Sequence, residues 1–160
     1  MKLYIRQKIF ALGDKYDVSD EFQNPVYQVH SELLTIGAKI HLEYPAGREL
    51  YYIRQRVTLF LGRYEIHRNG EMCATIQQEL AFFKPRLTME SSWGDFEITG
   101  NVFSMDFEIR KEGVLVGSVH KQWMAWSDTY ELYVPEGQDG AFFAAVVIAI
   151  DHCIHNGNKR

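Results

Sequence analysis

Apolar and polar residues alternate along most of the chain, which is the two-residue period of a half-buried β-strand. The alternation belongs to a repeated unit anchored at Gly47, Gly70 and Gly113. A branched aliphatic residue follows each of these glycines at the same spacing, as Ile53, Ile76 and Val119. Two copies also match before the glycine, as YEIHRNG and FEIRKEG. The unit therefore predicts a series of β-hairpins.

The turns and faces of these hairpins follow from the same unit. Asn69-Gly70 is a strong hairpin signal because both turn positions need positive φ, and Glu112-Gly113 keeps the glycine. Alternation assigns one face of each following strand to a core and the other to water. We expect the following side chains to point inward: Tyr51, Ile53, Val57, Leu59, Ala74, Ile76, Leu80, Phe82, Gly117, Val119 and Trp123. We expect the following to point outward: Arg54, Arg56, Thr75, Gln77, Glu79, Ser118, His120 and Gln122. Ala74 and Gly117 are small, which indicates that a bulky element packs closely against the inward face of the strands at these positions.

The end of the chain has a different pattern. Apolar residues run without a break from Ala141 to Ile150, which is longer than an average strand. Asp139 is the expected N-cap and Gly157 stands where a helix usually ends, so we predict a helix over residues 140–156. A helix that is apolar on every side must be buried on every side. About twelve strands would enclose a lumen too wide for their own side chains to fill, so the helix is expected to fill it.

The predicted fold is mainly β, with a closed antiparallel barrel of about twelve strands around a central C-terminal hydrophobic helix. No linker or low-complexity segment divides residues 1–160, and this length suits a single domain. The strands are expected between residues 3 and 134, at 3–10, 15–18, 26–31, 36–43, 49–60, 63–68, 71–81, 86–89, 96–99, 102–111, 114–124 and 129–134.

Composition limits the function without naming it. The formal net charge is −4 and no basic stripe dominates, so we expect no nucleic-acid partner. Cys73 and Cys153 are too few for a disulfide scaffold and are expected to be free, packed as small hydrophobic residues. Arg6 and Lys8 interrupt the place where a signal peptide has its apolar core. No segment approaches the ~20 apolar residues of a spanning helix, so we expect a soluble, cytoplasmic protein whose oligomeric state the sequence leaves open.

Polar residues follow the apolar run as Asp151, His152, Cys153 and His155. The two histidines share a helix face and zinc accepts such ligands, but a second element would have to complete the site. We expect instead a helix end that leaves the barrel, where the helix dipole favours positive charge. Lys121 stands at an inward position that holds glutamine in the other copies, so we predict a buried Lys121–Asp151 ion pair. We predict no catalytic residue, no metal site and no cofactor, since no motif for them is present.

Basic residues give the one candidate for a ligand site. Arg54 and Arg56 share the outward face of one predicted strand, and Lys84 and Arg86 add positive charge later in the chain. These four residues are predicted to form an anion-binding patch. The alternative is an ordinary solvated exterior.

Several pieces of the sequence resemble the LURP-one-related family, in its short bacterial YxjI-like branch. They are the N-terminal LYIRQKIFALGDKYDVSDEF, the hairpin VYQV, the repeated I-x-Q strands and the closing DTYELYV and FFAAVVIAID. Their order and spacing carry the resemblance over essentially the whole chain. The resemblance implies the tubby-like fold that tubby proteins share with phospholipid scramblases, a twelve-stranded barrel around a central helix. It also implies a link to membrane phospholipids, although no lipid-site motif of tubby proteins and no spanning tail of scramblases is recognised, so no lipid-binding residue transfers.

Three functions stay open at this point. The first is a non-enzymatic binding or scaffold module, cytoplasmic or peripheral at the membrane, that engages anionic lipid head groups or a protein partner. The second is an enzyme with an unrecognised site at a barrel mouth. The third is a lipocalin-like carrier, against which the helix in the lumen argues.

Overall fold

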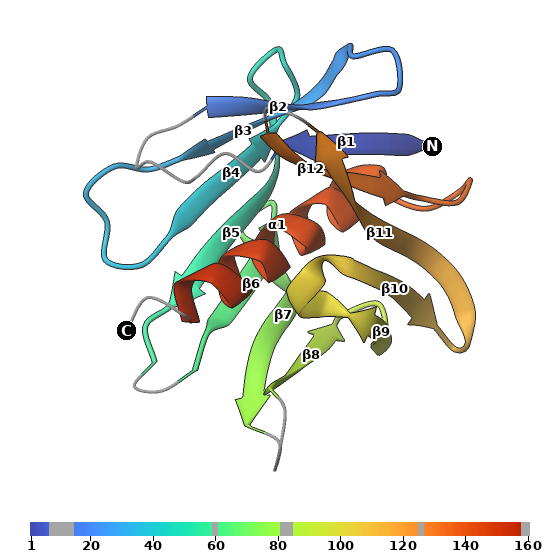
Figure 1. The fold of residues 1–160 in the computed structure, drawn as a ribbon. Coiled ribbons are helices and arrows are strands. Elements are labelled where there is room, and N and C mark those ends of the chain that lie inside the picture. The colour runs from blue at the N-terminus through green and yellow to red at the C-terminus, as the bar shows by residue number, and fades with distance from the viewer. Residues whose placement is uncertain (7–14, 59–60, 81–84, 125–126, 158–160) are drawn as a thin grey trace.

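The computed structural model describes residues 1–6, 15–58, 61–80, 85–124 and 127–157 and shows a closed antiparallel barrel of twelve strands around one helix (Figure 1). Each strand pairs with its neighbours in sequence, and β12 closes the ring by pairing with β1. The predicted fold class is confirmed. The strands are β1 Lys2–Arg6, β2 Lys15–Ser19, β3 Pro25–Ser31, β4 Lys39–Glu43, β5 Glu49–Arg56, β6 Arg63–Arg68, β7 Glu71–Leu80, β8 Pro85–Ser91, β9 Phe96–Asn101, β10 Asp106–Lys111, β11 Val114–Met124 and β12 Ser127–Tyr133.

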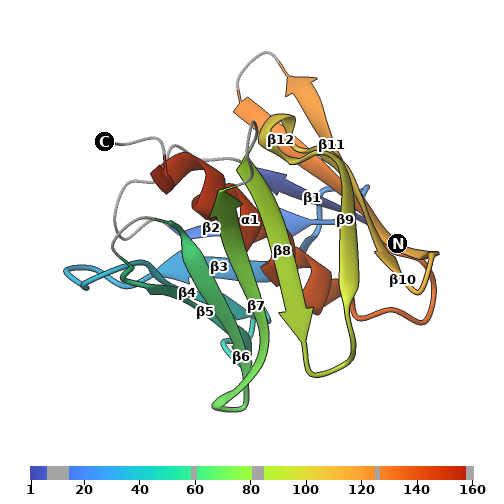
Figure 2. The ribbon, with the colours of Figure 1, turned by 90° about the horizontal axis from the view of Figure 1, so that it is seen from below.

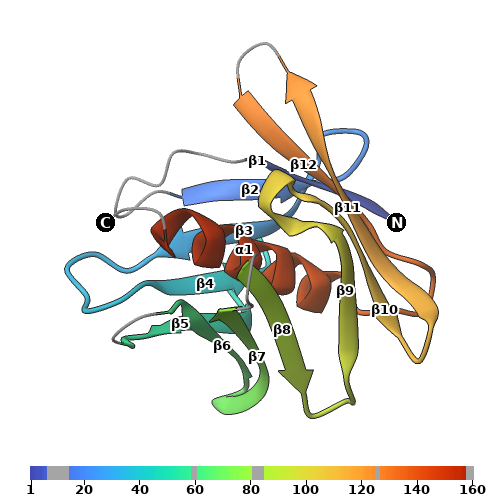
Figure 3. The same ribbon diagram turned by 60° about the horizontal axis from the view of Figure 1, so that its bottom comes forward.

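The helix α1, Gly140–Gly157, lies inside the ring of strands (Figures 2 and 3). Every side chain from Ala141 to Ile154 is buried, as expected for a helix that is apolar on all sides. Asp139 is the N-cap, because its Oδ1 accepts a hydrogen bond from the amide of Phe142 at 3.0 Å. The helix ends one residue later than predicted. The lumen is thus filled by the chain itself, as the sequence indicated.

The alternation assigned most positions of the repeated unit correctly, but Thr75 and Ser118, which were expected to face water, are buried with 8% exposure each. Ile53, Ile76 and Val119 are fully buried, whereas Arg54 and His120 are exposed and Gln77 is half-buried. The inner wall lies close to the helix at Gly117, where a Cβ would stand 3.5 Å from the ring of Phe143, an ordinary packing distance.

The two tight turns have the predicted backbone. Asn69 and Gly70 have φ of 52° and 81°, and Glu112 and Gly113 have φ of 50° and 78°. Both positions of each turn therefore lie in the left-handed region that the hairpin requires.

Two strands are shorter than predicted at the same end of the barrel. Residue 36 was expected to begin a strand, but β4 begins at Lys39 because Leu34 and Gly37, with φ of 57° and 78°, turn the chain first. Strand β5 ends at Arg56, so Val57 leaves the sheet and is 72% exposed. The prediction that Val57 points inward is therefore wrong.

The strand predicted at 102–111 also begins late. A short 3₁₀ turn, η1 Val102–Ser104, comes first, and β10 begins at Asp106. The side chain of Asn101 accepts a hydrogen bond from the amide of Ser104, which stabilises the turn in place of a strand. Some further predictions, the inward side chains of Leu59, Leu80, Phe82 and Trp123, lie outside the described residues.

The structure tests the expectations about the cysteines and about a membrane-spanning helix. Cys73 and Cys153 are free and buried as expected, and burial raises the pKa of each thiol to about 11. Within the described part of the chain, no helix is long and apolar enough to cross a membrane.

Candidate functional site

Four basic residues lie together on the outer wall of β4, β5 and β6. Lys39 of β4 stands opposite Arg54 of β5, and Arg56 stands opposite Arg63 of β6. Residues opposite each other in neighbouring strands share a face, so these four side chains share the outer one. We call Lys39, Arg54, Arg56 and Arg63 the basic strip.

Two carboxylates reduce the charge of the basic strip. Arg56 Nε lies 3.4 Å from Glu65 Oε1, and Lys39 Nζ lies 3.4 Å from Glu32 Oε2. Arg54 is exposed and makes no ion pair with any residue that the structure describes. Four cations therefore face two anions, and the local excess of positive charge contrasts with the net charge of −4 for the whole chain.

Arg86, the third residue of the predicted patch, does not join the basic strip. Arg86 is exposed on β8, opposite Glu79 of β7, and both β6 and β7 separate it from β5. Lys84 lies outside the described residues. The structure thus brings Arg54 and Arg56 together with Lys39 and Arg63, which the sequence alone did not single out.

Exposed apolar side chains lie at the end of the basic strip. The connection between β3 and β4 exposes 61% of Leu33, 97% of Leu34 and 88% of Ile36. It lies against the end of β5, since the amide of Ala38 donates a hydrogen bond to Gln55 Oε1 at 3.0 Å. We call Leu33, Leu34, Ile36 and Val57 the apolar turn.

The apolar turn and the basic strip form one continuous surface. A Cβ on Gly37 would stand 3.6 Å from the side chain of Val57, so the two connections touch. Lys39 follows the turn directly, and Arg56 directly precedes Val57. Soluble proteins rarely expose several large apolar side chains side by side. Basic residues next to such a patch favour a partner that is both apolar and anionic.

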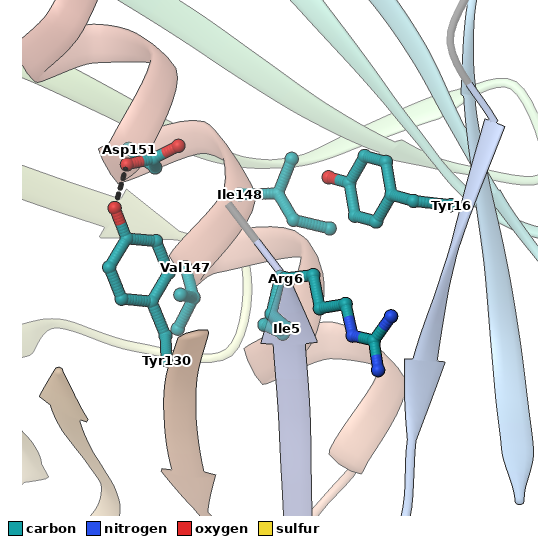
Figure 4. Close-up of a pocket in the computed structure, with 7 residues that line it drawn as sticks. All are labelled: Ile5, Arg6, Tyr16, Tyr130, Val147, Ile148 and Asp151. Carbon is teal, nitrogen blue, oxygen red and sulfur yellow. Dashed lines mark hydrogen bonds between the residues drawn. The ribbon is translucent and has the colours of Figure 1, made fainter. Parts of the chain in front are cut away.

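The end of the barrel that holds the helix C-terminus contains a buried carboxylate (Figure 4). Asp151 Oδ1 accepts a hydrogen bond from the hydroxyl of Tyr130 at 2.7 Å and lies 3.1 Å from Nδ1 of His155. Asp151 lines a space together with Ile5, Arg6, Tyr16, Tyr130, Val147 and Ile148, and that space has no room for a water molecule. The guanidinium of Arg6 points away from Asp151 (Figure 4). This packing suits a structural carboxylate better than a reaction site.

The predicted ion pair between Lys121 and Asp151 stays a prediction. Lys121 stands opposite Tyr130 in the sheet, and Tyr130 holds Asp151. The charge of Lys121 also acts against protonation of His155, whose pKa is nevertheless raised, chiefly by its hydrogen bond with Asp151. Both observations place Lys121 at this end of the barrel.

His152 does not leave the barrel as the sequence suggested. Its side chain is buried, its backbone carbonyl accepts a hydrogen bond from the hydroxyl of Tyr64, and the two rings lie 6.2 Å apart. Burial lowers the pKa of His152 to about 4, although the charge of Asp151 acts in the opposite direction. The imidazole is therefore neutral at pH 7.

We expect the stability of the protein to fall as the pH is lowered from about 6.5 to about 4. The unfolded chain takes up a proton on His152 below its ordinary pKa of 6.5, whereas the folded chain does so only near pH 4. His155 has the opposite effect on stability because its pKa is raised in the folded protein. Its contribution to the free energy of unfolding grows as the pH falls towards 6.5 and is constant below that pH. Between pH 7.5 and pH 5 the His152 effect amounts to about 2 kcal/mol. Urea unfolding of wild type and His152→Gln at both pH values should show this loss in wild type only, and equal pH dependence in both proteins would contradict it.

The opposite end of the barrel is more open. A hollow of about 190 Å³ lies beside the start of α1, lined by Trp93, Phe96, Phe142, Phe143, Arg68, Lys111, Gln138 and Asp139. Its one carboxylate is already engaged, because Asp139 Oδ2 accepts a hydrogen bond from Tyr51 at 2.8 Å and lies 3.8 Å from Arg68. Among the residues that the structure describes, no serine, cysteine or histidine lines this hollow.

Metal ligands gather elsewhere than at the helix end. Cys153 packs its thiol against the carbonyl of Gly62, and Nδ1 of His155 bonds to the carbonyl of Asp151. Among the described residues, the histidine and carboxylate side chains that converge are those of His30, His41 and Glu43, on β3 and β4. His30 lies on one strand and His41 and Glu43 on the next, so their convergence depends on strand pairing and no spacing motif revealed it.

Comparison with known proteins agrees with the fold. The protein is 24% identical to the uncharacterized protein YxjI of Bacillus subtilis (strain 168) over 156 residues, which cover 98% of this chain and 95% of that protein. The X-ray structure of the Arabidopsis thaliana protein AT5G01750 superposes with a TM-score of 0.67 at 16% identity, covering 94% of this chain and 88% of the other. The profile of the LURP-one-related family matches residues 1–151. The chain belongs to the LURP-one-related family.

Proposed function

We propose that this protein is a non-enzymatic binding module that attaches to anionic membrane surfaces through the apolar turn and the basic strip. The observation that carries the proposal is that the apolar turn lies next to the basic strip. Four exposed apolar side chains lie directly beside four basic ones at one end of the barrel. An apolar tip suits the acyl boundary of a bilayer, and flanking cations suit the phosphate groups above it.

The energies are adequate for reversible attachment. Each basic residue near an anionic surface contributes about 1 kcal/mol. Full burial of an exposed leucine or isoleucine side chain adds about 1.5–3 kcal/mol, and Leu34 and Ile36 are almost completely exposed before binding. The net charge of −4 gives no long-range attraction, so attachment depends on this local surface and falls as salt screens it, the Debye length being about 3 Å at 1 M.

Charge reversal in the basic strip is expected to weaken vesicle binding. Arg54→Glu with Arg56→Glu removes two favourable contacts of about 1 kcal/mol each, which corresponds to roughly a thirtyfold loss of affinity. The measurement is co-sedimentation with phosphatidylcholine vesicles that contain or lack phosphatidylglycerol, at low and high salt. Arg48→Glu with Arg86→Glu is the matched control, because both residues are exposed outside the basic strip and the change in net charge is the same.

The apolar turn provides the second arm of this experiment. Leu34→Ser with Ile36→Ser should weaken binding without changing the thermal midpoint, since both side chains are exposed in the folded protein. Val114→Ser changes a similarly exposed apolar residue at the start of β11 and should have no effect. Wild type that does not sediment with anionic vesicles at low salt overturns the proposal. If the turn variant instead changes the oligomeric state of the protein, the surface is a protein interface.

A further inference from the structure

A row of aromatic and imidazole rings crosses the outer wall of β3, β4, β5 and β6. His30 stands opposite His41, His41 opposite Tyr52, and Tyr52 opposite His67. Their ring centroids are 4.7, 5.0 and 5.8 Å apart along the row. The rings of His30 and His41 are stacked, and the side chain of His41 is only 18% exposed. Packing on the neighbouring rings therefore holds the two imidazoles in place.

A carboxylate completes a group of three ligands at one end of this row. Glu43 follows His41 by two residues in β4 and so shares its face. One donor atom from each of His30, His41 and Glu43 lies within 4.8 Å of the others, and Nδ1 of His30 is 3.7 Å from Oε2 of Glu43. Ligand atoms around a tetrahedral zinc ion with bonds of about 2.0–2.2 Å are roughly 3.4 Å apart. The ligand side chains must therefore rotate towards one another when an ion binds, which brings the imidazoles out of their stacked arrangement.

The surroundings of His41 favour metal coordination as well. Nδ1 lies 2.6 Å from Glu49 Oε2, and Nε2 lies 3.0 Å from Glu32 Oε1. A metal-bound histidine usually donates its other ring N–H to a carboxylate, which fixes the ring and strengthens the ligand. Because each nitrogen of His41 has its own carboxylate, coordination through either one leaves the other supported.

The charges around the two imidazoles and the type of ligand atom indicate which ion this group would bind. Glu32, Glu43 and Glu49 surround the two imidazoles, with Lys39 beside Glu32 and Lys15 opposite His30. The excess of carboxylates attracts a cation. Imidazole nitrogen favours zinc and related transition metals over calcium and magnesium, which prefer oxygen ligands.

We propose that His30, His41 and Glu43 bind one divalent transition-metal ion, with zinc as the representative, on the outer wall of β3 and β4. Three protein ligands leave a fourth position for water. The ion would bridge β3 and β4. The connection between these strands carries Leu33, Leu34 and Ile36 of the apolar turn, so the ion would restrain that connection where it leaves the sheet. This inference rests on the ligand geometry and is independent of membrane binding.

The test is zinc binding to the full chain, measured with zinc chloride against a chromophoric chelator. We expect one ion per chain, and a loss of affinity of at least about tenfold in His30→Gln and in Glu43→Gln, since even the loss of an outer-shell partner typically costs 10–100-fold. His67→Gln and His120→Gln are the controls. His67 belongs to the same row without being a ligand, and His120 lies on β11, paired with Asp106. Both controls should bind zinc as wild type does.

A second readout separates binding from folding. Zinc should raise the thermal midpoint of wild type and of both controls, because a ligand that binds the folded state stabilises it, and at the same zinc concentration it should raise that of His30→Gln less. Absence of binding by wild type overturns the proposal. So does wild-type affinity in both His30→Gln and Glu43→Gln, or a loss of affinity in His155→Gln alone, which would place the ion at the helix end.

Discussion

Replacement of Val147 by aspartate is expected to abolish folding. Val147 has no exposed surface and lies in the middle of α1, inside the ring of strands. It lines the same space as Asp151, one helical turn further on, and that space has no room for a water molecule (Figure 4). The new carboxylate would therefore be buried without a partner and beside a second carboxylate on the same face of the helix.

The expected cost exceeds what a domain of this size can lose. An uncompensated buried charge costs several kcal/mol, and the whole stability of a domain is typically about 5–15 kcal/mol. Moving the helix out of the barrel would not avoid this cost, because the apolar inner faces of the strands would then be exposed to water. Val147→Ala keeps the site apolar and should cost only about 2 kcal/mol.

Circular dichroism and thermal unfolding give the measurement. Val147→Asp should be insoluble or lack a cooperative transition, whereas Val114→Asp, at a position 64% exposed, should unfold as wild type does. A soluble Val147→Asp protein with an unchanged spectrum and thermal midpoint would mean that α1 is not the packed centre of the fold.

The parts of the fold that the sequence predicted are those controlled by local physics. Period-two alternation fixed the inward positions of Ile53 and Val119, and the glycine in Asn69-Gly70 fixed the turn before the strand that holds Ile76. The unbroken apolar run after Asp139 indicated burial on all sides of a helix. Each of these signals lies within a few residues, so no knowledge of strand pairing was needed.

Strand ends and the outer surface depend on pairing and were predicted less well. Val57 continues the apolar alternation of β5, yet it lies outside the sheet because the strand ends at Arg56. Arg54 and Arg86 looked equivalent as basic residues, but two strands separate them once the barrel is closed. Leu34 has a positive φ that sequence alone does not predict for leucine.

The ligands of the proposed metal site show the same limit. His30 and His41 both fall on outward positions of their strands, which the alternation could have indicated. Their juxtaposition depends on the register of β3 against β4, and the seven residues from Glu32 to Ala38 between those strands set it. Without that register, two histidines and a glutamate on neighbouring strands do not differ from an ordinary polar exterior.

The second large effect is expected at Gly100, which lies where β9 meets β10. Gly100 has a φ of 117°, a conformation that side chains rarely adopt. A Cβ there would lie 2.7 Å from the carbonyl oxygen of Asp106 and 2.9 Å from Cα of Phe107. Both atoms belong to the backbone of the paired strand, where Phe107 stands opposite Gly100, so no side chain can rotate to make room.

Gly100→Ala should therefore cost more than the backbone strain alone, in total roughly 2–4 kcal/mol. Gly47→Ala is the matched control, because Gly47 also has a positive φ, 91°, but nothing lies within 4 Å of its Cβ position. We expect that control to lose only about 1 kcal/mol in urea unfolding.

Strand β9 meets β8 only at Met89 and Phe96 in the described register, and Phe96 packs on the helix residues Phe142 and Phe143. Amide hydrogen exchange of Gly100→Ala should consequently accelerate first in β9, and equal losses of stability in the two glycine variants would show that the close backbone contact contributes nothing.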